Sequence, residues 1–280
     1  MGKNLASKAP LAEQPQAVYW EVASRYWKDI ATVNPQWAWD SYYNSLIPDE
    51  TSRILVMGVT NGSFMELIKQ FKPQAWVCGI DLSPGMLEMA ISRGNEVICC
   101  RGDYLPFEDG SFDFVLSDYF LSVIPEEVLE GTIKEIDRVL KKGGSFVAKE
   151  LRNRGHLVLW SASSLGCGIL GVAGFIFSPL LAGAFFVLSG LALLSYNPFS
   201  HTMGKSARIV KFILHLTRFT LRRKKVPTLA EIRDLYFISE KYLHVFTDRE
   251  LYSVFEPYSL GIKTEPALIS WNFSIIGVKQ

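Results

Sequence analysis

Arg53-Ile-Leu-Val-Met-Gly-Val-Thr-Asn-Gly-Ser-Phe64 is the stretch that decides the fold of this chain. The apolar run at residues 54–57 predicts a buried parallel strand, and the glycines at 58 and 62 predict the turn that follows it. A helix should begin directly afterwards, because apolar residues recur at helical spacing at 64, 67, 68 and 71. A strand, a glycine turn and a helix open a doubly wound nucleotide-binding sheet, in which glycines let the backbone approach a ligand. Taken alone, the stretch fits an ordinary turn equally well.

A second apolar run, Val77-Cys-Gly-Ile-Asp81, predicts another strand that ends in an acid. The acid follows the glycine turn by about twenty residues, where a doubly wound fold places a carboxylate for ribose hydroxyls. A helix cap or a solvated turn is the alternative role for Asp81. Ser83 is the better N-cap, however, because Pro84 follows it at the first helical position. We therefore expect Asp81 to be free at the tip of the strand.

Composition narrows the possible functions. The chain has 280 residues and a net charge of +1, so no global field for nucleic acid is evident and none is expected as a partner. The four cysteines, at 78, 99, 100 and 167, form no C-x-x-C pair. We therefore predict neither a metal site nor a disulfide framework, and the cysteine usage fits a reducing compartment. The first residues lack the apolar core of a signal peptide.

The remaining elements complete a layered α/β fold. Further strands are predicted at residues 96–100, 114–117 and 145–149, with helices at 84–93 and 126–140 between them. Alternating apolar residues at 262–269 and 271–279 predict a final pair of strands. The fold class is therefore α/β, a doubly wound, Rossmann-like, seven-stranded sheet with helices on both faces.

Four segments carry a resemblance to a known family. They are residues 53–64; Gly79-Ile-Asp81-x-Ser83-x-x-Met86-Leu87; Gly102-Asp103 with Leu105-Pro-Phe107-x-Asp109-x-Ser-Phe-Asp113; and Glu135-x-x-Arg138-Val-Leu-x-x-Gly-Gly144. In this order and spacing they resemble the class I S-adenosylmethionine-dependent methyltransferases, and within them the branch that methylates small molecules, quinols, sterols and phospholipid head groups. The chain departs from the family pattern at Thr60, which replaces the middle glycine of the loop, and at Val59, which replaces a common Cys or Ala.

The resemblance implies S-adenosylmethionine as the cofactor and implies which residues bind it. The backbone of Gly58, Val59, Thr60 and Gly62 would face the methionyl group, and Asp81 would hold the ribose hydroxyls. Leu82 and Met86 would flank the adenine, whose amino group would donate to Asp103 near the Tyr104 amide. Ser117, Asp118 and Tyr119 would line the space near the sulfonium. A turn acid is the alternative for Asp103, and simple packing is the alternative for Tyr119.

An uncharged segment interrupts the family pattern after the fifth strand. Residues 155–204 contain no Asp, Glu, Lys or Arg, and they hold two apolar runs, 157–177 and 180–196. The first run is long enough to cross a bilayer and the second is marginal. Basic residues flank the segment on both sides, which favours a hairpin with both ends on the cytoplasmic face. We therefore expect an apolar helical membrane hairpin between the fifth strand and the last helix, with the lipid bilayer as partner through 157–196. The core of an inserted cap domain is the alternative.

Two helical regions have more than one interpretation. Residues 17–47 are rich in Trp and Tyr, which fits helix faces packed on the sheet, a lid over the cofactor, or a membrane-interface belt. Residues 205–225 form a basic amphipathic helix, which suits either a surface of anionic lipid or a solvated domain surface. The expected organisation is a tail and aromatic helical lid at 1–50, a cofactor-binding core at 51–150, the hairpin and basic helix at 151–227, and a completing helix and strands at 228–280.

These observations lead to three functional hypotheses. The first is a membrane-anchored methyltransferase, with its catalytic domain on the cytoplasmic face, acting on a lipophilic small molecule. The second is the same enzyme with a soluble acceptor, and the third is a non-catalytic scaffold that binds the cofactor. The catalytic base is unknown, with Tyr119, His156 and His201 as weak candidates. The acceptor atom and the oligomeric state stay open.

Overall fold

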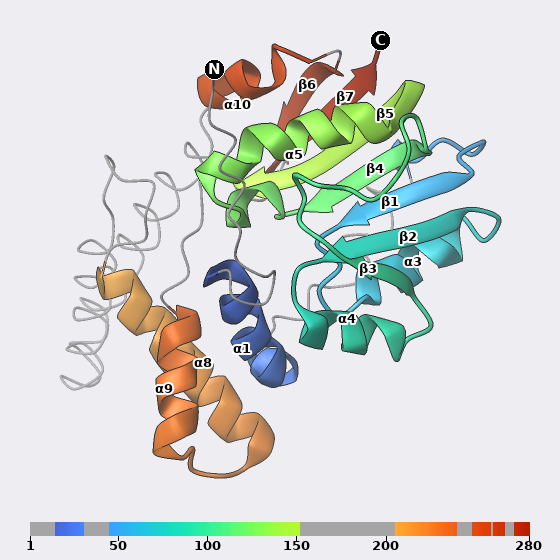
Figure 1. Cartoon of the computed structure of the whole chain (residues 1–280). Helices are drawn as coiled ribbons and strands as arrows, with labels where there is room; N and C mark the ends of the chain where they lie inside the picture. Colours follow the sequence, from blue (N-terminus) through green and yellow to red (C-terminus); the bar gives the residue numbers. More distant parts are fainter. Residues whose placement is uncertain (1–14, 31–44, 152–204, 240–247, 259, 267–271) are drawn as a thin grey trace, which may run out of the picture.

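The computed structural model describes residues 15–30, 45–151, 205–239, 248–258, 260–266 and 272–280 (Figure 1). Its strands are β1 (Arg53–Met57), β2 (Trp76–Asp81), β3 (Glu96–Cys99), β4 (Phe112–Asp118), β5 (Leu140–Leu151), β6 (Leu260–Pro266) and β7 (Asn272–Lys279). They form one seven-stranded sheet in the order β3-β2-β1-β4-β5-β7-β6. The first five strands are parallel, and β7 runs antiparallel to both β5 and β6. The predicted α/β seven-stranded sheet is confirmed.

Helices cover both faces of the sheet because alternate strand residues point to opposite sides. On one face, α3 (Ser63–Phe71) and α4 (Pro84–Ile91) pack against a core that contains Ile54 and Val56. On the other face, α5 (Glu126–Val139) and α10 (Asp248–Phe255) pack against a core that contains Leu55 and Met57. The apolar stripe of each helix therefore buries one of two separate cores.

The fifth strand is longer than the sequence pattern indicates. β5 begins at Leu140 rather than at residue 145, since Leu140 pairs with Phe112 before the register shifts. Gly143, with φ 76°, lies in this irregular part of the strand. The two lysines and two glycines at 141–144 predict a turn here, and the structure has an irregularity at these positions, between the β4 pairs of Leu140 and Ser145.

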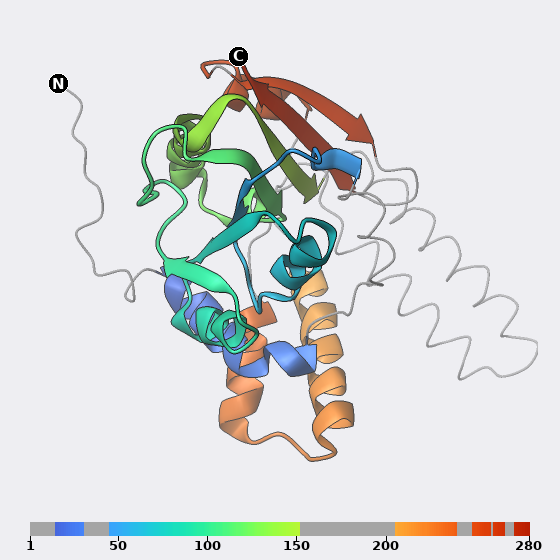
Figure 2. The same cartoon turned by 90° about the vertical axis from the view of Figure 1, so that its right-hand side faces the viewer.

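A third group of helices lies beside the sheet, at the side away from β6 and β7 (Figures 1 and 2). It consists of α1 (Pro15–Ile30), α8 (Lys205–Arg223) and α9 (Leu229–Ser239), which we call the helical unit. Phe219 of α8, Tyr26 of α1 and Leu235 of α9 are buried against one another in a cluster that also takes in Met86 of α4. Part of the apolar face of α8 is thus packed within the protein, although Ile213 on that face is 50% exposed.

The membrane prediction falls largely on residues that the structure does not describe. The predicted hairpin, residues 157–196, lies outside the described part of the chain. Within the described part, no helix combines the length and the apolar composition needed to cross a bilayer.

Candidate cofactor site

The loop after β1 turns tightly at the carboxyl edge of the sheet. The Gly58 and Val59 amides both donate to the Ile80 carbonyl, at 2.9 and 3.0 Å, and the Gly62 amide donates back to the Val59 carbonyl at 2.9 Å. Gly62 has φ 77°, and a Cβ built on it would lie 2.8 Å from the Ala90 Cα atom. Only glycine therefore fits at position 62, where α3 begins.

Thr60 is the strained residue of this loop. Its φ is 49°, in the left-handed region that β-branched residues rarely adopt. The family pattern has a glycine at this position, so the departure noted in the sequence coincides with the backbone conformation that favours glycine. The surrounding loop holds Thr60 in place at a local energetic cost.

Asp81 lies at the end of β2 and fixes this loop. Its side chain is buried, with 7% of its surface exposed. One carboxylate oxygen accepts the Thr60 amide and the other accepts the Ser83 amide, both at 3.0 Å. The expectation that Asp81 would be free at the strand tip is therefore wrong, because two backbone amides converge on it. Ser83 is the N-cap of α4 as predicted, and accepts the Met86 amide at 3.2 Å.

The two residues expected beside the adenine lie in different environments. Leu82 is half-buried at the edge of the sheet. Met86 has no exposed surface, because its side chain packs against the helical unit. Met86 would therefore reach a cofactor only if those neighbours moved.

The loop after β3 presents Asp103 and Tyr104. Both Asp103 oxygens accept hydrogen bonds from the Arg101 guanidinium, one of them at 2.7 Å from Nε. Tyr104 is 77% exposed and its amide donates to the Arg101 carbonyl at 3.3 Å. An adenine amino group would thus have to share Asp103 with Arg101.

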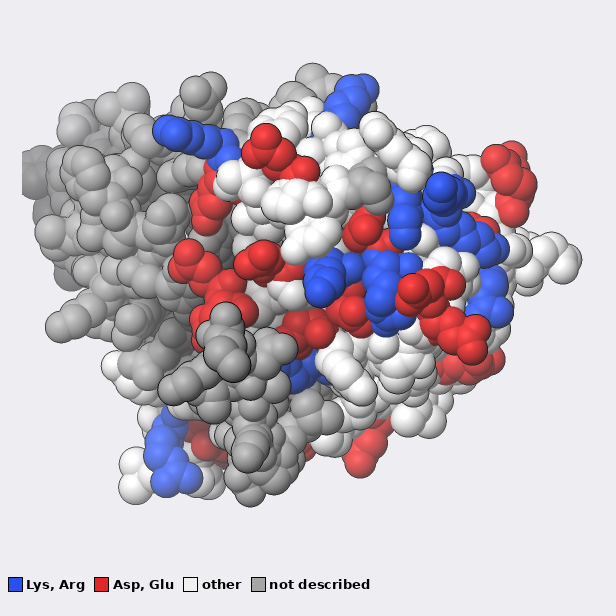
Figure 3. Space-filling model, turned by 45° about the horizontal axis from the view of Figure 1, so that its top comes forward, with Lys and Arg blue, Asp and Glu red and all other residues white. Residues whose placement is uncertain are grey.

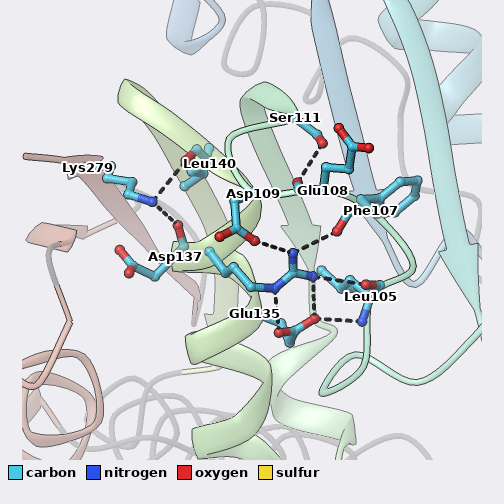
Figure 4. A network of polar contacts seen from close by, with 10 residues as sticks. Leu105, Phe107, Glu108, Asp109, Ser111, Glu135, Asp137, Leu140 and Lys279 are labelled. Atoms are coloured by element: carbon cyan, nitrogen blue, oxygen red, sulfur yellow. Dashed lines mark hydrogen bonds and ion pairs between the residues drawn. The ribbon is translucent and has the colours of Figure 1, made fainter.

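Two of the family segments meet in one polar network that supports this loop (Figure 4). The Arg138 guanidinium donates to the Leu105 and Phe107 carbonyls, at 2.9 and 2.7 Å, and forms ion pairs with Glu135 and Asp109. Glu135 in turn accepts the Leu105 amide at 2.8 Å. Residues about thirty positions apart therefore act together, and their role is to hold the loop that carries Asp103.

The segment after β4 is fixed to the end of β5. Ser117 is fully buried. Tyr119 has φ 56°, and its amide donates to the Lys149 carbonyl at 2.8 Å. Next to it, the buried carboxylate of Glu150 accepts the amides of Leu121 and Ser122, at 3.0 and 2.9 Å, as well as the Ser122 hydroxyl at 2.5 Å.

Glu150 was not among the site residues expected from the sequence. Its signal is an acid two positions after the apolar run 146–148, directly after the predicted end of a buried strand. Burial raises the pKa of this carboxyl to about 8, although hydrogen bonds from Ser122 and Leu121 oppose the rise.

Helix α1 bridges two sides of the site. The Gln16 amide nitrogen donates to the Val123 carbonyl at 3.0 Å, in the short 3-10 helix η2 (Leu121–Val123) that follows β4. One turn further on, the Glu21 carboxylate accepts the Ser83 hydroxyl at 3.1 Å and the Gly85 amide at 2.9 Å, at the start of α4. Within the predicted lid, α1 is therefore the part that contacts both the segment after β4 and the start of α4.

Two of the candidates for the catalytic base, His156 and His201, lie outside the residues that the structure describes. Among the residues that are described, no group of three or more His, Cys, Asp or Glu side chains could hold a metal ion. On the face shown in Figure 3, acidic and basic side chains are interspersed rather than gathered by sign.

Residues 55–148 match the family described as "Methyltransferase domain". A demethylmenaquinone methyltransferase of Staphylococcus aureus is 39% identical over 89 residues, which is 30% of this chain and 36% of that protein. An uncharacterized protein of Methanocaldococcus jannaschii is 37% identical over 97 residues, 34% of this chain and 42% of that protein. By the family match, residues 55–148 form a methyltransferase domain. The chain spans less than half the length of the curated relatives it matches.

Solved structures agree on the fold of the methyltransferase domain. A protein of Pyrococcus horikoshii has a TM-score of 0.58 at 15% identity, covering 91% of this chain and 99% of that one. An S-adenosylmethionine-dependent methyltransferase of Methanosarcina mazei has a TM-score of 0.51 at 18% identity, covering 85% and 97%.

The Methanosarcina mazei neighbour is S-adenosylmethionine-dependent, and the residues present in this chain would fit that methyl donor at two points. The loop at 58–62 turns at two glycines, Gly58 and Gly62, which carry no side chain. The Asp81 carboxylate lies beside this loop. Both features suit a ligand with a ribose and a charged methionyl group.

Proposed function

We propose that this protein is an enzyme that transfers a methyl group from S-adenosylmethionine to a lipophilic small-molecule acceptor at a membrane. The observation that carries the choice of acceptor is the uncharged run at 155–204, which follows β5 after only three residues. β5 ends at the same edge of the sheet as the loops after β1 and β2. A segment suited to lipid therefore leaves the domain beside the expected methyl donor.

A quinol is the first candidate for the acceptor. The Staphylococcus aureus relative is a demethylmenaquinone methyltransferase, although the similarity extends over only 30% of this chain. Isoprenoids, sterols and phospholipid head groups are the other lipophilic acceptors to test. For this reason demethylmenaquinone is the acceptor to supply first.

The proposed roles of the chain's own residues follow from their positions. S-adenosylmethionine supplies a methyl group on a sulfonium, whose carbon–sulfur bond breaks as the acceptor bonds to the methyl carbon. The loop at 58–62 and Asp81 would bind and orient the donor, while Asp118 and Tyr119 would line the space near the sulfonium, with the fully buried Ser117 behind them. The main contribution of such a site is alignment and exclusion of water. An oxygen or carbon acceptor also loses a proton to a base.

Two alternatives share the same domain. A membrane-anchored enzyme with a soluble acceptor would need the apolar run only for its location. A cofactor-binding scaffold without activity would fit the strained Thr60, but the intact pair of acids, Asp81 and Asp103, favours an enzyme. We propose the cytoplasmic face of a membrane as the location, because basic residues precede and follow residues 157–196.

The test supplies S-adenosylmethionine labelled in its methyl group to membranes that contain the overexpressed protein and demethylmenaquinone. We expect label in the organic phase with the wild type and none with Asp81→Ala. Label confined to the aqueous phase would replace the proposal by the soluble-acceptor alternative. No transfer to any acceptor, combined with normal binding of S-adenosylhomocysteine, would favour the scaffold.

The membrane location has its own test. A variant that lacks residues 157–196 should move from the membrane pellet to the supernatant after cell fractionation. Wild-type protein that is already recovered in the supernatant without detergent would contradict the proposed location, and would leave the methyltransferase assignment unaffected.

A further inference from the structure

Glu150 is a fully buried acid to which the cofactor site, as described so far, gives no role. Glu150 is the second-last residue of β5 and has no exposed surface. An unpartnered carboxyl group would be costly there, yet both of its oxygens accept hydrogen bonds from the end of β4 and the segment that follows it. Oε1 accepts the Leu121 amide at 3.0 Å and the Ser117 hydroxyl at 3.3 Å, and Oε2 accepts the amide and hydroxyl of Ser122.

The same segment carries an aromatic ring that lies between the two glycine-bearing loops of the site. A Cβ built on Gly58, in the loop after β1, would lie 2.7 Å from the Phe120 ring. A Cβ built on Gly102, in the loop after β3, would lie 2.8 Å from the far end of that ring. Phe120 therefore separates the loops expected to hold the methionyl group and the adenine.

The position of the Phe120 ring is restrained by the backbone on either side of it. Tyr119, immediately before it, has φ 56°, and its amide donates to the Lys149 carbonyl. Leu121 and Ser122, immediately after it, donate their amides to Glu150. Two consecutive residues of β5 thus restrain the backbone on both sides of Phe120, and a strained conformation persists only when its surroundings hold it.

We propose that Glu150 is a positioning residue of the methyltransferase site, which holds the segment at 119–122 so that Phe120 sets the spacing between the Gly58 and Gly102 loops. This role is independent of the identity of the acceptor and rests only on the cofactor domain. It also explains why a carboxylate is retained at a fully buried position, since an amide nitrogen in place of either oxygen would face a backbone N–H donor.

A double-mutant cycle tests whether Glu150 acts through Phe120. The affinity for S-adenosylhomocysteine is measured by calorimetry on the full chain for Glu150→Gln, Phe120→Leu and the double variant. We expect Glu150→Gln to weaken binding about tenfold, near the upper end of the range for the loss of one typical hydrogen bond. In the Phe120→Leu background the same change should weaken binding less than about twofold, because coupled residues are not additive.

Two further variants separate positioning from general loss of structure. Ser122→Ala removes one donor and should weaken binding in the same direction with a smaller effect on the urea midpoint. Ser111→Ala is the matched control, since its hydroxyl bonds the Glu108 carbonyl at the opposite end of β4, and it should leave binding unchanged. Equal effects of Glu150→Gln in both backgrounds, or unchanged affinity in a folded Glu150→Gln protein, would overturn the proposal. Failure to methylate a lipophilic acceptor would not, because the readout is binding.

Discussion

The Thr60 amide donates a hydrogen bond of 3.0 Å to the Asp81 carboxylate, and this contact joins a strained residue of the site to a buried acid. Thr60 follows β1 and Asp81 ends β2, so the contact ties together the carboxyl ends of two neighbouring strands. The loop conformation and the orientation of the carboxylate therefore depend on each other.

The strain at position 60 predicts a stabilising substitution. Thr60→Gly should raise the free energy of unfolding by up to about 1 kcal/mol, because glycine adopts φ 49° without steric cost although it loses more backbone entropy on folding. Urea denaturation measures the change. Thr60→Ala, which keeps a Cβ, is the control and should give a smaller gain; an equal gain from both would show that φ is not the source.

Replacement of Asp81 should remove cofactor binding. Asp81→Ala deletes the acceptor of two backbone amides and of the expected ribose hydroxyls, each charge-assisted bond being worth roughly 1.5–3 kcal/mol. Calorimetry with S-adenosylhomocysteine should show no measurable binding. Asp113→Ala is a useful comparison, because Asp113 binds Ser52 and Lys141 at the opposite end of the sheet. If Asp81→Ala retained wild-type affinity, the site assignment would be wrong.

The buried Glu150 predicts a specific pH dependence of stability. Its pKa rises from 4.5 to about 8 on folding, chiefly through burial, with a smaller contribution from the nearby charge of Asp118. The folded state therefore binds more protons than the unfolded state between these values, so stability should fall as the pH rises from about 4.5 to 8. Urea midpoints from pH 5 to 8.5 should show a shallower fall in Glu150→Gln than in the wild type. Parallel curves would mean that Glu150 does not titrate in this window.

The Arg138 network predicts a loss of both stability and binding. Arg138→Met should lower the free energy of unfolding by about 2 kcal/mol, since it leaves the Leu105 and Phe107 carbonyls without their donor. The loop that carries Asp103 would loosen, so affinity for S-adenosylhomocysteine should fall as well. Lys142→Met, at an exposed lysine in the same region of the chain, controls for the change of charge and should have little effect.

The close approach of α1 and α4 can be tested at Gly85. A Cβ there would lie 2.9 Å from the Cβ and 2.2 Å from the hydroxyl of Ser24, so Gly85→Ala should push α1 away from the site. We expect faster proteolysis within α1 and weaker binding of S-adenosylhomocysteine. Adding Ser24→Gly should restore part of the affinity. Unaltered proteolysis would show that α1 tolerates the change, and would weaken the interpretation of α1 as a lid.

Local sequence patterns were enough to predict most strands of the sheet and the edge of the sheet at which the cofactor is expected to bind. Apolar runs, the glycine turn and the Ser83 cap are properties of neighbouring residues, so β1, β2 and the start of α4 could be predicted to within one or two positions. The choice of Asp81 as a site residue came from the same source, since an acid at the end of a buried strand is visible in the chain itself. These features need no knowledge of distant contacts.

Tertiary structure alone decided which groups those residues meet. Nothing in the local sequence indicates that Met86 is buried beneath the helical unit, or that Glu150 accepts two amides from the segment after β4. Each depends on strands or helices far apart in the chain, and a single sequence contains no direct signal for such pairings. Burial then determines the consequence, because a carboxylate removed from water must find donors wherever the fold brings them.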